Sequence, residues 1–514
     1  MVTVDSTVVN VALPAIADDL GGGLAGQQWT ANAYLVTLAS LILVGGSLGD
    51  LFGARRVFEL GVIGFGVTSV FCAVAPTIEL LVLSRALQGV CGAVLTPAAL
   101  AVIAATFPPN ERGRAIGAWT AWSGIGTVLG PLIGGQLVDE ASWRWIFAVN
   151  VPVVLVTLFL VRRVMPPAHA RAPGARVDVV GAALCALGLA GITYGLIEQP
   201  RLGWEDPAVW LPLAAGALLF AGFILWEARS SHPMLPLALF RRRNFTFGNI
   251  ETFAMYAGLG LLFFFLVLYL QQVAGYSALE AGSTTIPVTI VMFLTSTRFG
   301  MLADRHGPRL FMGFGPLIAA AGLALFLRLD ADVDYVTDLL PGLLVFSVGL
   351  SIVVAPLTAT VLADADEHNA GVASGVNNAI ARAASLIAIA AVGALVASSF
   401  GSSLRDDLGA AAERPEVARA IEEAERQPLA TVAVDDAPPD VRAEVARASE
   451  DSSVEAFRTA VAIATGLVAL GGVLGLAGIA NPRRRVDAAD CPGGQLAGVP
   501  RDAAGCPPED RAAA

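Results

Sequence analysis

The sequence contains no lysine, and all 32 of its basic residues are arginine. A nucleotide-binding P-loop needs a lysine that reaches the β- and γ-phosphates, so the chain carries no ATP-hydrolysing motor of this class. Histidine is also scarce, because His169, His232, His306 and His368 are the only ones and all fall in predicted loops. Their spacing matches no catalytic motif, and no nucleic-acid-binding motif is present. We therefore expect neither an enzyme nor a nucleic-acid-binding protein.

Cysteine and charged residues are also scarce in this sequence. Cys72, Cys91 and Cys185 lie in apolar runs, and the other two of the five cysteines lie near the C-terminus. This arrangement has neither a disulfide framework nor metal-ligand spacing, so the sequence predicts no metal site. Charged residues make up only 15% of the chain.

Apolar residues dominate instead. They make up 55% of the 514 residues, which is above the usual range for a soluble globular protein. A membrane-spanning helix needs about 20 mostly apolar residues, and 14 segments approach this description. The sequence therefore predicts an all-α polytopic membrane protein. The predicted spans are 1–17, 31–49, 57–75, 78–105, 113–138, 145–161, 178–197, 208–227, 245–270, 280–302, 309–329, 338–362, 370–400 and 455–480.

The placement of loop arginines predicts the orientation. Arginines cluster after the even-numbered spans, for example Arg55 and Arg56 after the second and Arg112 and Arg114 after the fourth. Cytoplasmic loops carry the excess of basic residues, so we expect both termini in the cytoplasm.

One segment carries most of the net charge of −11. Residues 401–455 contain 14 acidic residues and 6 arginines, a balance of −8. We expect residues 401–453 to form an extracytoplasmic loop, with short surface helices near 416–426 and 440–450. The tail after 485 is predicted to be disordered because it is rich in Pro, Gly and Asp.

An internal repeat links two loops. GSLGDLFGARR (46–56) and GMLADRHGPRL (300–310) both fit G-x-L-x-D-x-x-G-x-R. Repeated halves are how many secondary transporters build a site between two bundles. A carboxylate at the end of a span can meet loop arginines or a helix N-terminus, so the repeat predicts a conformational latch; a charged turn that only fixes topology is the alternative. The latch residues would be Asp50, Arg55, Arg56, Asp304, Arg305 and Arg309.

Asp5, in DSTVVNVALP (5–14), lies in a predicted span. A carboxylate at membrane depth costs about 3 kcal/mol and suggests a functional site. Arg85, in RALQGVCGA (85–93), lies inside another span and could modulate the protonation of such an acid. Only four residues precede Asp5, so an acid that simply reaches water is the alternative. For the same reason we expect the true start to lie upstream.

GTVLGPLIGG (126–135) places Gly126, Gly130 and Gly134 on one helical face, with Pro131 and Gly135 beside them. Small residues at this spacing let membrane helices pack closely, and proline kinks a helix.

Together these motifs, with WRWIFAVNVP (143–152) and ASGVNNAIAR (373–382), resemble the major facilitator superfamily, specifically its fourteen-span drug:proton antiporter branch. The resemblance implies a proton-coupling role for Asp5 and Arg85, and it makes the glycine-proline motif an exporter signature. Cys91 departs from the family pattern, which usually has glycine there.

The resemblance also implies the domain organisation. Residues 1–161 would form an N-terminal six-helix bundle, and 162–243 would hold two inserted helices with flanking cytoplasmic loops. Residues 244–480 would form the C-terminal six-helix bundle, including the acidic loop 401–453, and 481–514 a cytoplasmic tail.

Six polar residues within the spans are candidates for the substrate cavity, and two of them, Glu251 and Arg382, could pair. The candidates are Asn10, Gln88, Asn150, Glu251, Asn378 and Arg382.

The expected function is a proton-driven exporter of hydrophobic small molecules such as drugs, antibiotics and dyes, working by alternating access. We expect a monomer in the cytoplasmic membrane of a bacterium that uses the proton gradient and no cofactor. Two alternatives stay open: an exporter of one lipid, siderophore or metabolite, and a non-transporting membrane sensor that uses the acidic loop.

Overall fold

The computed structural model describes the chain with several gaps. The described residues are 1–106, 126, 129–164, 178–231, 233–363, 370–409, 412, 414, 417, 418, 421 and 439–481. Residues Met1–Ile479 form one compact unit. The described part is helical and contains no strand. Its main helices are α1 (Val2–Leu20), α2 (Gly23–Phe52), α3 (Ala54–Ala73), α4 (Ile78–Thr106), α6 (Trp145–Ala148), α7 (Asn150–Val164), α8 (Val179–Leu202), α9 (Pro207–Glu227), α10 (Arg243–Gln272), α11 (Ala278–Ser283), α12 (Ile286–His306), α13 (Arg309–Leu325), α14 (Leu340–Ala363), α15 (Ala370–Leu408) and α17 (Pro439–Gly478).

Within these residues, 12 helices are long and apolar enough to cross a membrane. Of the remaining two predicted spans, 1–17 corresponds to α1. The other, 113–138, is described only at residue 126 and over residues 129–140, which are helical. The all-α fold is therefore confirmed, while the count of fourteen spans stays a prediction.

Two boundaries differ from the sequence-based prediction. The acidic segment is not a loop along its whole length, because α15 continues to Leu408 and α17 begins at Pro439. Leu404, Leu408 and Val445 are buried, and the alanine, glutamate and arginine around them favour helix. The predicted span 280–302 is divided at Thr284 and Thr285, because Pro287 in the first turn of α12 has no backbone N–H to continue the hydrogen bonds of α11.

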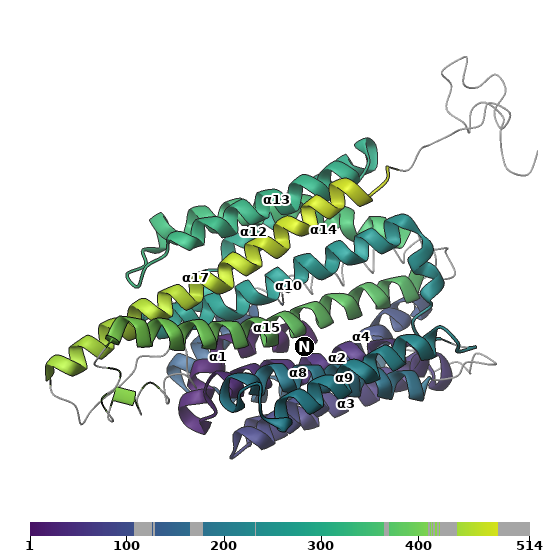
Figure 1. The fold of residues 1–514 in the computed structure, drawn as a ribbon. Helices are drawn as coiled ribbons and strands as arrows, with labels where there is room; N and C mark the ends of the chain where they lie inside the picture. Colours follow the sequence, from purple (N-terminus) through teal and green to yellow (C-terminus); the bar gives the residue numbers. More distant parts are fainter. Residues whose placement is uncertain are drawn as a thin grey trace, which may run out of the picture. The chain divides into compact units, whose positions relative to one another are not determined.

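Helix pairs pack closely in both halves of the compact unit. Figure 1 shows α8 beside α9 and α13 beside α17, and α15 contacts α10 and α17 on one side and α2 and α8 on the other. The α2–α4 contact is especially close, because Gly89 in α4 lies against the carbonyl oxygen of Tyr34 in α2, where a Cβ would overlap it. Small residues permit such backbone approach, and here they bring α4 against α2.

Residues of the WRWIFAVN stretch fix the end of α1. The indole Nε1 of Trp143 donates to Asp19 Oδ2 over 3.0 Å, and Arg144 forms an ion pair with the same carboxylate. Arg144 also donates to the carbonyl of Ala75 after α3, over 3.3 Å. The chain then passes through α6 into α7, whose first residue is Asn150.

Candidate functional site

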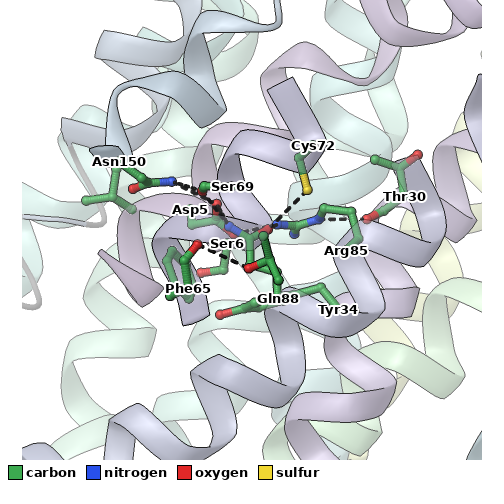
Figure 2. A network of polar contacts seen from close by, with 12 residues as sticks. Asp5, Ser6, Thr30, Tyr34, Phe65, Ser69, Cys72, Arg85, Gln88 and Asn150 are labelled. Carbon is green, nitrogen blue, oxygen red and sulfur yellow. Dashed lines mark hydrogen bonds and ion pairs between the residues drawn. The ribbon is translucent and has the colours of Figure 1, made fainter. Parts of the chain in front are cut away.

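Asp5 is fully buried in α1 and is the centre of a polar network (Figure 2). Its Oδ2 accepts a hydrogen bond from Arg85 Nη1 over 2.5 Å. Its Oδ1 accepts from Gln88 Nε2 over 2.9 Å and from Asn150 Nδ2 over 3.3 Å. The structure therefore places Arg85 beside Asp5 and encloses the Asp5 carboxylate away from the surface.

Arg85 in α4 is 1% exposed and is held by more than its ion pair. It donates from Nε to the carbonyl oxygen of Thr30 over 3.2 Å, and from Nη1 to Gln88 Oε1 over 2.6 Å. Its Cζ lies 4.4 Å from the centre of the Tyr34 ring, a cation–π distance. A guanidinium stays protonated in proteins, so these contacts position a permanent positive charge.

Ser69 in α3 joins the two amides of the network. Its hydroxyl oxygen lies 2.9 Å from Gln88 Nε2 and 3.0 Å from Asn150 Nδ2, and accepts from both. Cys72 Sγ donates to Gln88 Oε1 over 3.6 Å, so this cysteine also belongs to the network. Ser69 and Cys72 were not predicted, because a lone serine or cysteine in an apolar run has no spacing that marks it.

The network couples four helices through one ionisable group. Asp5, Ser69, Arg85 and Asn150 come from α1, α3, α4 and α7. A buried ion pair is tolerated when further hydrogen bonds satisfy both charges, and removing one partner costs about 3–5 kcal/mol. Protonation of Asp5 would remove the negative charge and leave Arg85 with neutral partners only. The site can therefore convert proton binding into a change in how these helices hold together.

The glycine-proline motif packs on the other side of α1. A Cβ at Gly126 would lie 3.2 Å from Val4 Cγ2, and one at Gly130 or Gly134 would overlap Thr7 or Val8. These α1 residues flank Asp5 in the sequence. The predicted close packing is therefore present, and it is made with the helix that carries the buried acid.

The same motif reaches the C-terminal half of the chain. A Cβ at Gly135 would overlap the backbone of Leu279 in α11. Four residues further along, Asp139 accepts hydrogen bonds from the amides of Ala278 and Leu279, over 3.0 and 2.8 Å. Pro131 lies against Gly282 of α11. These contacts join the N-terminal and C-terminal halves of the chain near the C-terminal end of α1.

Replacing Asp139 by alanine is expected to loosen this contact. The change removes a side chain that satisfies two amides at a helix N-terminus, which costs about 0.5–2 kcal/mol. Hydrogen–deuterium exchange of the Ala278 and Leu279 amides, which donate to Asp139, would report the change as faster exchange. Asp18→Ala is the control, because Asp18 is exposed in α1 near this contact. Unchanged exchange of these two amides in Asp139→Ala would show that the cap does not hold this end closed.

The predicted latch is only partly visible. The side chain of Asp50 lies outside the described residues. Arg55 pairs with Glu59 over 2.9 Å, and Arg309 Nε donates to the carbonyl of Leu476 over 2.6 Å. The other three, Arg56, Asp304 and Arg305, are exposed. Among described residues Asp304 forms no ion pair, so the latch stays a prediction.

The predicted cavity residues separate into two groups. Gln88 and Asn150 belong to the Asp5 network. Asn10 is half-buried without a hydrogen bond among the described side chains, and Asn378 Nδ2 donates to Ser374 of its own helix over 3.0 Å. Arg382 is half-buried.

The expected pair of Glu251 and Arg382 is not formed, and neither joins a salt bridge in the described part of the chain. Asn377 on α15 instead donates to Asn249 and Thr252 on α10, over 3.1 and 2.8 Å.

Comparison with known proteins agrees with this architecture. The family model of the Major Facilitator Superfamily matches residues 1–400. The tetracenomycin C resistance and export protein of Streptomyces glaucescens is 37% identical over 79% of this chain and 75% of its own length. The puromycin resistance protein pur8 of Streptomyces alboniger is 36% identical over 79% of this chain and 81% of its own.

Multidrug resistance protein Stp of Mycobacterium tuberculosis is 31% identical over 91% of this chain and 88% of its own length. Among solved structures, a bacterial homologue of the human lysosomal transporter Spinster, described as inward-facing and unoccupied, has a TM-score of 0.62 at 18% identity, and the match covers 94% of this chain and 96% of that one. That similarity shows the fold alone. The match of the family model and the identity to these relatives show that the chain is a multi-pass membrane transporter of the Major Facilitator Superfamily.

Proposed function

We propose that this transporter is a proton-coupled antiporter that exports hydrophobic small molecules, antibiotics among them, by alternating access. The observation that carries the proposal is the fully buried Asp5 with Arg85 as its counter-ion. The names of the relatives, which include resistance to or export of tetracenomycin C and puromycin, support the substrate class.

The chemistry follows from the charge of Asp5. As a carboxylate it accepts hydrogen bonds from Arg85, Gln88 and Asn150 and holds α1 against α4 and α7. A proton bound to Asp5 weakens all three bonds, because charge-assisted hydrogen bonds are roughly twice as strong as neutral ones. One protonation state then favours the packing described here, and the other favours a rearranged one that exposes the opposite side.

The setting of this cycle is the cytoplasmic membrane of a bacterium, with both termini in the cytoplasm and the protein acting as a monomer. The proton gradient drives it without a cofactor. With this orientation, the contact of Asp139 with α11 lies on the extracytoplasmic side and holds the two halves together there.

The test is substrate-evoked proton movement in proteoliposomes with an acidic interior and a trapped pH dye. Wild type is expected to release protons when lipophilic cations or neutral antibiotics are added, and Asp5→Asn is expected to release none, because an amide cannot bind the proton. Asp18→Asn is the matched control, since Asp18 is an exposed acid on the same helix.

The panel of compounds also separates the alternatives. Release by many unrelated compounds supports broad export, and release by one compound only supports a specific exporter. Proton release that persists in Asp5→Asn would contradict the role of Asp5.

A further inference from the structure

A second buried carboxyl group lies in the C-terminal half. Glu251, near the start of α10, is fully buried. Neither of its carboxyl oxygens has a hydrogen-bond partner among the described residues. Asp5 is buried to the same degree but accepts three hydrogen bonds, and the one from Arg85 is also an ion pair. The two acids therefore occupy opposite electrostatic environments.

The surroundings of Glu251 are backbone and apolar groups. Its Oε2 lies 2.9 Å from the position that a Cβ at Gly475 in α17 would occupy, and its Cγ lies 3.8 Å from the corresponding position at Gly471. Met312 of α13 contacts the same glycine through its carbonyl oxygen. The carboxyl group is thus enclosed between α10, α17 and α13, where two glycines leave room for it.

The charged groups of these three helices are directed elsewhere. Arg243 of α10 donates to the carbonyls of Gly478 and Ala477, over 2.7 and 3.1 Å. Arg309 of α13 donates to the carbonyl of Leu476. On α17 the nearest charged residue before Gly475 is Arg458, about 25 Å away along the helix. Both nearby arginines therefore stabilise the end of α17, and neither bonds to Glu251.

Arg382 lies on α15, which also packs against α10, and it forms no ion pair in the part of the chain that the structure describes. A buried carboxylate without a counter-charge is so unfavourable that such groups take up a proton instead. In the described conformation Glu251 is then accommodated as the neutral acid, with its proton retained on the carboxyl group.

We propose that Glu251 is a second proton-binding site of this transporter, loaded in the conformation described here and emptied when α10 separates from α17 and α13. In that step the carboxyl O–H bond breaks, the proton passes to a water molecule that enters between the helices, and the charge stays on Glu251 in contact with water. The proton binding stands on the geometry of Glu251 alone, while its use in transport rests on the proposed function.

The opposite face of α10 supports this movement. Asn377 of α15 bonds to Asn249 and Thr252, on either side of Glu251 in the sequence. Glu251 lies eight residues after the first residue of α10, which is about 12 Å along the helix. A short rearrangement at this end of α10 would therefore bring water to the carboxyl group while the bonds to α15 persist.

Labelling with dicyclohexylcarbodiimide tests the proton directly on the full-length protein in detergent. This hydrophobic reagent reacts with protonated carboxyl groups. Mass spectrometry is expected to find the modification on Glu251 at neutral pH and less of it as the pH rises, with little on Asp5, which is paired with Arg85. Absence of the label on Glu251 at neutral pH, or labelling that does not change with pH, would overturn the proposal.

Transport by Glu251→Gln tests the use of that proton. Glutamine has the shape of the neutral acid, so the variant is expected to fold and to transport, but with the protons moved per substrate reduced by half. An unchanged proton-to-substrate ratio would overturn the proposal and leave Glu251 as a neutral packing residue. If Asp5→Asn retained full coupling, the proposed function would fail, whereas the pH-dependent labelling of Glu251 would still stand. If Glu251→Gln failed to fold, the labelling of wild type would decide.

Discussion

Arg85→Gln is expected to destabilise the protein by about 3–5 kcal/mol and to abolish substrate-evoked proton release. The magnitude follows because the change leaves the fully buried Asp5 carboxylate without its counter-ion. The remaining donors, Gln88 and Asn150, are neutral amides and compensate only part of a buried charge. Thermal unfolding of the purified protein in detergent gives the stability, and the proteoliposome assay gives the coupling.

A double variant separates the ion pair from other roles of Arg85. Asp5→Asn/Arg85→Gln removes both charges, so it is expected to be more stable than either single variant, because contacting charges are not additive. Its coupling should nevertheless stay absent, because the Asp5 carboxylate, through which proton binding changes the contacts of α1 with α4 and α7, has been removed. Arg201→Gln is the control: its pair with Glu198 is largely exposed on the arginine side, 55%, and such pairs contribute under about 1 kcal/mol.

Two outcomes would contradict the expected role of the Asp5–Arg85 pair. If Arg85→Gln unfolded at the wild-type temperature, the pair would not stabilise the fold. If the double variant were no more stable than the singles, Arg85 would act through Thr30 and Tyr34 rather than through Asp5. Arg85→Lys adds a further check, because lysine is a point charge and does not reproduce the geometry of a guanidinium that contacts several acceptors.

Sequence reasoning found the charged residues of this site and the amides Gln88 and Asn150, and it missed Ser69 and Cys72. Asp5 and Arg85 are conspicuous because ionisable residues are rare in membrane spans. Ser69 and the carbonyl oxygen of Thr30 carry no such signal, although each bonds directly to the network. Their contribution depends on which helix faces meet, and that is a property of packing rather than of spacing.

The fold shows a similar division. Apolar length identified the helices, because a span is a local property of the chain. The predicted end of α15 and the predicted start of α17 were wrong, because the acidic composition was interpreted as a loop. Both helices extend into this segment, where the sequence is rich in alanine and Leu408 and Val445 are buried. Glu251 was expected to pair with Arg382, but the two do not form an ion pair. The carboxyl group of Glu251 is directed towards Gly475 instead, and the sequence alone does not give the direction of a side chain.

Gly134→Ala is expected to cost about 1–3 kcal/mol, the usual range for overpacking a filled interface, and to reduce coupling strongly. A Cβ at Gly134 would overlap Val8 Cγ2, and the Cβ and carbonyl oxygen of Val8 each lie 3.4 Å from it. Valine has essentially one side-chain rotamer in a helix, so the overlap is relieved only by moving α1. Moving α1 displaces Asp5 from Gln88 and Asn150.

Val8→Ala in the same chain gives the decisive comparison. It removes Cγ2, the atom that the new methyl group would overlap, so Gly134→Ala/Val8→Ala is expected to regain stability and coupling that either single variant loses. Gly222→Ala is the control, because a Cβ there meets nothing within 4 Å. Recovery in the double variant would mean that the motif acts by holding α1, and with it Asp5, in position. A coupling defect that persists after stability recovers would mean instead that Gly134 must stay small so that this interface can move during the transport cycle.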